Sequence, residues 1–325
     1  MTSRAITGES LAMAALVMFS ISTILTKVAS GRLNLNAGFV ISVSVNVAFA
    51  TLVLCVQLAL QQEALQWNAV GFSLFLISGV FSTYLGRWFF FESIARLGPA
   101  KASTFQVSSP LFTAVIAWLV LGERLSGVAV GAMALTLFGL LVVAVNPASL
   151  ARSGWGAQGA TRPNSGGVAT TARAKTPFGA LLRSGLALGI ASSAAYAVGN
   201  VLRGAALRSW DEAILGALLG ALAAIALQAL FGSGTMKILR DLHSSDRTAL
   251  FAYSAGGILS ISAQMCMIAS MAYIPVAVAT LITLCSPVLV FPMSYFFLKN
   301  EEGIGPRTIL GCALTLAGIA VIVLF

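Results

Sequence analysis

The chain has 325 residues, of which 58% are hydrophobic and only 9% are charged. A soluble domain carries about 25% charged residues, so these charges are too few to cover the surface of a water-soluble globule. The composition predicts a membrane protein with several spans and excludes most classes of soluble enzyme. The formal charge of +9 comes from basic residues between apolar segments, a pattern typical of membrane topology signals rather than of a nucleic-acid-binding surface.

Ten apolar segments are long enough to cross a bilayer as helices, which takes roughly 20 residues each. They cover residues 10–29, 37–60, 69–93, 99–121, 126–145, 179–202, 212–231, 248–272, 275–298 and 305–325. We therefore predict an all-α polytopic membrane protein with ten transmembrane helices.

Residues 146–178 interrupt this series. The stretch is rich in Gly, Ala, Ser and Thr, and its charges are all positive. Such a composition cannot bury enough apolar surface to fold, so it predicts a disordered basic linker. The linker divides the chain into a first five-helix repeat, residues 1–145, and a second one, residues 179–325.

The two halves are related in sequence at an offset of about 177 positions. Gly79 then corresponds to Gly256, and the pair Ser109–Pro110 to Ser286–Pro287. A unit of five helices has an odd number of spans, so its second copy must insert upside down. Inverted repeats are typical of secondary transporters, which bind their substrate at the repeat interface near the bilayer midplane.

The distribution of basic residues predicts the orientation. Most of them, including those of the linker, fall on one side of the predicted spans, whereas Arg4, Arg124, Arg203 and Arg208 fall on the other. The positive-inside rule then places the linker in the cytoplasm and both termini outside.

Several short motifs of the sequence resemble those of a known family. In the first half they are Leu97–Ala102, Ser109–Pro110 and Trp118–Leu125, and in the second, more loosely, Ile274–Ala277, Ser286–Pro287 and Leu298–Glu302. They resemble the bacterial EamA-domain proteins, ten-helix members of the drug/metabolite transporter superfamily. The resemblance implies ten helices around a central cavity and alternating access. It also implies a bacterial inner-membrane protein that exports amino acids or other small metabolites.

Arg87 is the first candidate for substrate binding. A charge inside a bilayer is expensive and usually faces a bundle interior or an aqueous cavity. Its guanidinium can form two hydrogen bonds to a substrate carboxylate. Gln264 takes the equivalent place in the second repeat. The alternative is that Arg87 reaches out to the headgroups at the membrane surface.

Neutral polar residues in the predicted central helices complete the candidate site. They are Tyr84, Gln264, Tyr196, Asn200, Ser20 and Thr283. As a group they predict the lining of a polar cavity, although Ser and Thr in membrane helices also bond to their own backbone or to neighbouring helices. Lys27 and Arg203, which close the first helix of each half, are interpreted as anchors at the membrane interface, the alternative being contact with the cavity.

Pro110 and Pro287 fall within the fourth predicted helix of each half. A mid-helix proline removes a backbone donor and kinks the helix. Two kinks at equivalent places predict hinges for a gate, or else fixed bends needed for packing.

These observations favour a small-molecule permease, expected to work as an exporter, with the lipid bilayer as its surroundings. The single histidine, His243, lies outside the spans, and no pair of acids lies within them. An enzyme is therefore not expected, and the scattered Cys residues predict neither a metal site nor a cofactor. The alternative is a non-transporting accessory or lipid-flipping component of envelope assembly. Substrate, energy coupling, oligomeric state and the role of the linker stay open.

Overall fold

Helices make up nearly all of the chain that the computed structural model describes. The described residues are 3–30, 32–33, 35–61, 67–90, 106, 108–123, 125–144, 185–231, 246–286, 288–290, 293 and 306–324. No strand occurs among them. The predicted linker, Pro287 and the Leu298–Glu302 motif lie outside these ranges.

The helices follow the predicted order. In the first half they are α1 (Ser3–Ser30), α2 (Leu35–Gln61), α3 (Ala69–Ser78), η1 (Gly79–Gly86), α6 (Ser109–Leu121) and α7 (Gly127–Ala144). In the second half they are α11 (Gly185–Ser209), α12 (Ala213–Phe231), α14 (Arg247–Ser270), α15 (Val276–Leu284) and α17 (Pro306–Leu324). Since η1 continues α3 without a break, the described part holds ten helical rods, one for each predicted span.

Five of the described helical segments are long and apolar enough to cross a membrane. They are Arg4–Thr26, Ala37–Leu60, Ala69–Phe90, Ala213–Phe231 and Arg247–Ser270. Four more apolar helices are shorter within the described residues. The tenth rod, α11, has 25 residues but is not among these apolar helices, because it carries several polar side chains and two arginines. The protein is an all-α polytopic membrane protein.

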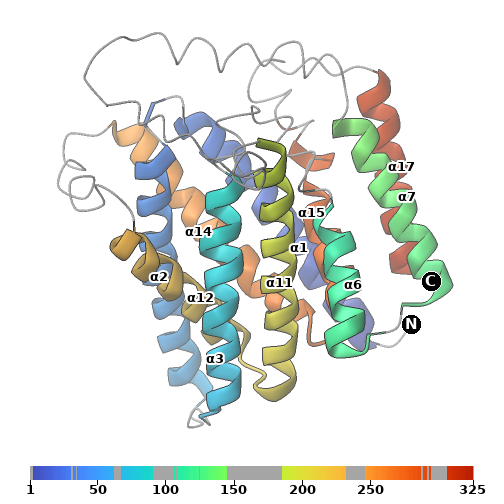
Figure 1. The fold of residues 1–325 in the computed structure, drawn as a ribbon. Coiled ribbons are helices and arrows are strands. Elements are labelled where there is room, and N and C mark those ends of the chain that lie inside the picture. Colours follow the sequence, from blue (N-terminus) through green and yellow to red (C-terminus); the bar gives the residue numbers. More distant parts are fainter. Residues whose placement is uncertain are drawn as a thin grey trace, which may run out of the picture.

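The helix packing repeats under a two-fold operation. Helix α1 packs on α14 and α15, and its counterpart α11 packs on α3, η1 and α6. Likewise α2 packs on α14, while α12 packs on α3 and η1. Three further pairs place a helix beside its own counterpart: α2 with α12, α6 with α15 and α7 with α17. In Figure 1, α1 runs upward from the N-terminus and α11 runs downward, so the two repeats are inverted.

Two equivalent helix starts tie the repeats together at opposite ends. Asn68 caps α3 and Asp246 caps α14, and each side chain accepts a backbone N–H of its own first turn, which satisfies a donor that the helix leaves free. Asn68 also donates to the Ser209 carbonyl at the end of α11 (2.9 Å), and Arg32, just after α1, donates to Asp246 (3.0 Å). This contact lowers the pKa of the Asp246 carboxyl. Each repeat thus anchors the end of the other's first helix.

Helices α7 and α17 form a pair at one side of the bundle (Figure 1). Thr136 of α7 lies against Gly318 of α17, and Thr315 of α17 lies against Gly139 of α7. This reciprocal contact of a threonine with a glycine brings the two backbones close, as small residues do between membrane helices. Met133 and Leu137 of α7 join the pair to α15 through Ala277 and Leu281.

Candidate functional site

Arg203 of α11 is a buried charge at the centre of the polar contacts between the repeats. The residue is 4% exposed. The guanidinium donates to Asn200 on the same helix, to Thr83 of η1 and to Gln264 of α14, each at 3.3 Å. The interpretation of Arg203 as an interface anchor is therefore wrong. The predicted segment stopped at residue 202, but α11 continues to Ser209, which places Arg203 about 9 Å inside the helix end.

Arg87 approaches the same region from the first repeat. It follows η1, is half-buried, and its guanidinium carbon lies 5.3 Å from the centre of the Phe39 ring, a cation–π contact. The Tyr196 phenol lies within electrostatic range of both Arg87 and Arg203. Of the predicted residues, Asn200 and Gln264 thus bond directly to Arg203, and Tyr196 lies within electrostatic range of both arginines.

The polar face of α11 packs on η1 through small residues. A Cβ added to Gly199 would lie 2.5 Å from the Cβ of Ser82, and one added to Gly86 would lie 3.1 Å from the Tyr196 ring. Ser192 donates to the Gly86 carbonyl at 2.8 Å. The π-helical winding of η1 is uncommon, and such segments occur frequently at functional sites. It presents Thr83 toward Arg203.

The other predicted residues make different contacts. Tyr84 packs with Phe39, Val43 and Ala224 between α2 and α12. Ser20 is fully buried and donates to the Leu16 carbonyl of its own helix at 2.7 Å, with a longer contact of 3.5 Å to the Ser286 carbonyl. Thr283 donates to the Ala279 carbonyl of its own helix. Hydrogen bonds to the local backbone are thus present for both hydroxyls.

The predicted hinge at Pro110 has a different setting from the one expected. Pro110 lies in the first turn of α6, which begins at Ser109, rather than in the middle of a helix. Proline is tolerated there because its missing N–H needs no partner in the first turn. Pro287 lies outside the described residues.

At the lower end of the bundle, Glu123 joins three helix termini. Its carboxylate accepts the backbone N–H of Val276, which begins α15, at 3.1 Å and forms an ion pair with Arg208 of α11 at 3.2 Å. Arg208 also donates to the Leu121 carbonyl at the end of α6 (2.7 Å). A carboxylate is stabilised at a helix N-terminus because the free N–H groups and the helix dipole attract it.

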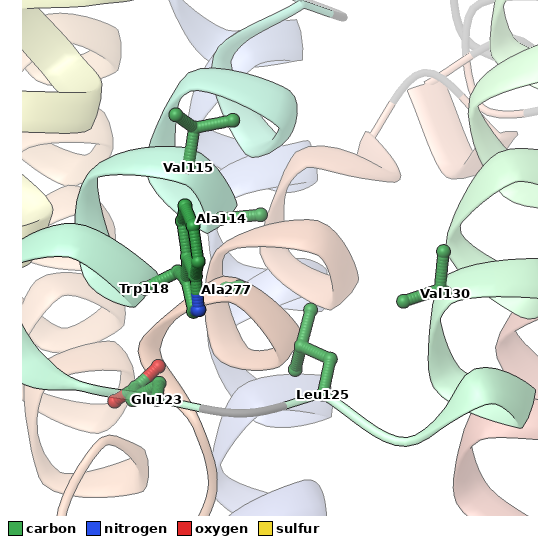
Figure 2. Close-up of a pocket in the computed structure, with 7 residues that line it drawn as sticks. All are labelled: Ala114, Val115, Trp118, Glu123, Leu125, Val130 and Ala277. Carbon is green, nitrogen blue, oxygen red and sulfur yellow. The ribbon is translucent and has the colours of Figure 1, made fainter.

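Two open pockets adjoin Glu123. Figure 2 shows the first, of about 430 Å³, between α6, α7 and α15, with Trp118, Leu125 and Val130 around it. Trp118 and Val130 are largely exposed, so in a membrane this apolar crevice faces lipid. The second, of about 440 Å³, lies at the ends of α11 and α14 and reaches Gly204, the residue next to Arg203.

The sequence does contain a signal for Arg203. Ser192, Tyr196, Asn200 and Arg203 are spaced by four, four and three residues, which places them on one face of a helix. The predicted segment ends at residue 202, one residue before Arg203, so it leaves Arg203 out of this stripe.

The comparisons with known proteins agree with the fold. The sequence pattern of the EamA-like transporter family matches residues 6–145 and 183–324. One solved structure, described only as the crystal structure of a protein, is similar with a TM-score of 0.65 and 16% identity. The match covers 98% of this chain and 96% of that one, and at this identity it shows the fold alone. No curated protein matches the sequence.

Proposed function

Since the chain belongs to the EamA-like transporter family, we propose that it moves a small metabolite, an amino acid or related solute, out of the cell by alternating access. The membrane would be the bacterial inner membrane. The proposed binding residues are Arg87, Tyr84, Gln264, Tyr196, Asn200, Ser20 and Thr283, with Pro110 and Pro287 as candidate hinges.

One observation supports this proposal above the others. The polar contacts of Arg203 join α11 and α14 of the second repeat to η1 of the first. Secondary transporters with inverted repeats bind their substrate at such an interface. A buried polar group between two rigid bundles is also where rocking of one bundle against the other would change access.

The test compares a strain that overexpresses the protein with a deletion strain, followed by flux measurements in liposomes. The overexpressing strain is expected to accumulate one or a few small solutes in the medium. Liposomes that contain the purified protein should release the same solutes faster than protein-free liposomes. Movement of labelled lipid between leaflets without solute flux would contradict the proposal and support the alternative, a lipid-flipping component.

The proposed orientation has its own test. We expect both termini outside and residues 146–178 in the cytoplasm, since the linker carries much of the positive charge. A tag after Phe325 should then react with an impermeant reagent in intact cells, whereas a tag within the linker should react only after permeabilisation. The reverse pattern would overturn this orientation.

A further inference from the structure

Arg203 is a buried cation whose described partners are all neutral. They are the side-chain oxygens of Asn200, Thr83 and Gln264. Within the described ranges, Arg203 forms no ion pair with a carboxylate. An ion held away from water without a counter-charge is costly, so the surroundings of Arg203 favour an added anion.

The guanidinium is also incompletely bonded. Its three contacts are all 3.3 Å long, whereas charge-assisted N–H···O bonds are about 2.7–2.9 Å. The Nε atom is buried and has no partner in the described part of the chain. Donor capacity therefore remains for a stronger acceptor than the amide and hydroxyl oxygens that now surround it.

A second cation strengthens this preference. Arg87 and Arg203 come from different repeats, and Tyr196 lies within electrostatic range of both. The described side chains around this tyrosine thus supply two positive charges. An anionic group would be attracted from both repeats at once.

We infer that Arg203 binds the carboxylate of the transported solute, with Asn200, Thr83 and Gln264 holding the guanidinium in place until the solute displaces their weak contacts. The planar guanidinium of an arginine can donate two parallel hydrogen bonds to the two oxygens of a carboxylate. This inference rests on the proposed transport function and specifies its substrate class: solutes with a free carboxylate, not their amides or esters.

Gln264→Glu tests the inference without knowledge of the solute. The substitution keeps the size of the side chain and places a carboxylate against Arg203. The internal ion pair should raise the thermal midpoint of the purified protein by at least about 2 °C, and it should reduce export at least about tenfold because it occupies the anion site. Gln264→Met, of similar size and uncharged, should not raise the midpoint. A midpoint for Gln264→Glu at or below that of the wild type would overturn the inference.

Binding is measured separately, by thermal unfolding in detergent with the L-amino acids as probes. At least one amino acid should stabilise the wild type, while its C-terminal amide should not. Arg203→Gln should weaken this binding at least about tenfold and remain folded, since it removes an unpaired buried charge. The exposed Arg247→Gln is the control and should bind as the wild type does. Equal binding of acid and amide, or no stabilisation of the wild type by any amino acid, would refute the carboxylate site.

The outcomes separate the two proposals. If the wild type exports a solute and both Arg203→Gln and Gln264→Glu export it equally well, the transporter proposal stands and the anion site is wrong. If amino acids bind through Arg203 but no solute crosses the liposome membrane, the binding site stands and the transport function is wrong.

Discussion

Gly139→Val is expected to leave little folded protein. A Cβ at this position of α7 would lie 2.6 Å from the backbone nitrogen of Thr315 and 2.7 Å from the Gly311 carbonyl oxygen of α17. Backbone atoms cannot move aside as a flexible side chain can, so α7 and α17 would have to separate. Overpacking of this kind costs on the order of 3 kcal/mol. The measurement is the fraction of monodisperse protein after extraction in detergent, together with its thermal midpoint.

Gly131→Val is the matched control. Gly131 lies on the same helix, and a Cβ there meets no atom within 4 Å. Both substitutions change the intrinsic helix propensity in the same way, so any difference between them reports the contact with α17. Equal yields and midpoints for the two variants would contradict the close packing of α7 on α17.

Arg87→Ala is expected to reduce export of the solute at least about tenfold while the protein stays folded. The lost interaction with an anionic solute accounts for the transport effect, since a hydrogen bond to a charged group contributes about 1.5–3 kcal/mol. The described contact that Arg87 makes in the structure, with the Phe39 ring, contributes only about 1 kcal/mol to stability. The measurement is efflux of the solute that accumulates outside cells overexpressing the wild type, normalised to the amount of protein in the membrane.

The control for Arg87 is Arg247→Ala. Arg247 is exposed in the first turn of α14, so its removal should leave efflux unchanged. If Arg87→Ala exports as fast as the wild type, Arg87 does not contact the solute.

The sequence was sufficient to predict the arrangement of the helices but not the contacts of the candidate site. Apolar segments of about 20 residues and an odd number of helices per repeat determine the inverted architecture almost by themselves, because the bilayer permits few alternatives. The site depends on which helix faces meet. No sequence pattern in Gly79–Gly86 indicates that this segment is a π-helix. Nor does a sequence pattern indicate that Thr83 contacts Arg203, which lies 120 residues later in the chain.

The wrong interpretation of Arg203 arose because the end of its helix was predicted too early. Its position six residues before the end of α11 could be recognised only by following the polar stripe beyond residue 202. The internal repeat placed Ser20 and Thr283 in central helices, yet it could not reveal that their hydroxyls bond to their own helices. Local backbone bonds of this kind compete with any external partner.

The contacts of Glu123 have a consequence for the route to Arg203. The side chain of Val276 occupies the space beside Gly204, where an added Cβ would lie 2.3 Å from it, and the same residue's N–H is held by Glu123. The backbone of Val276 is thus held by a carboxylate that also forms an ion pair with Arg208 of α11. Any opening from the second pocket toward Arg203 that displaced Val276 would have to break these contacts of Glu123. Hydration of the freed Glu123 and Arg208 would offset part of that cost.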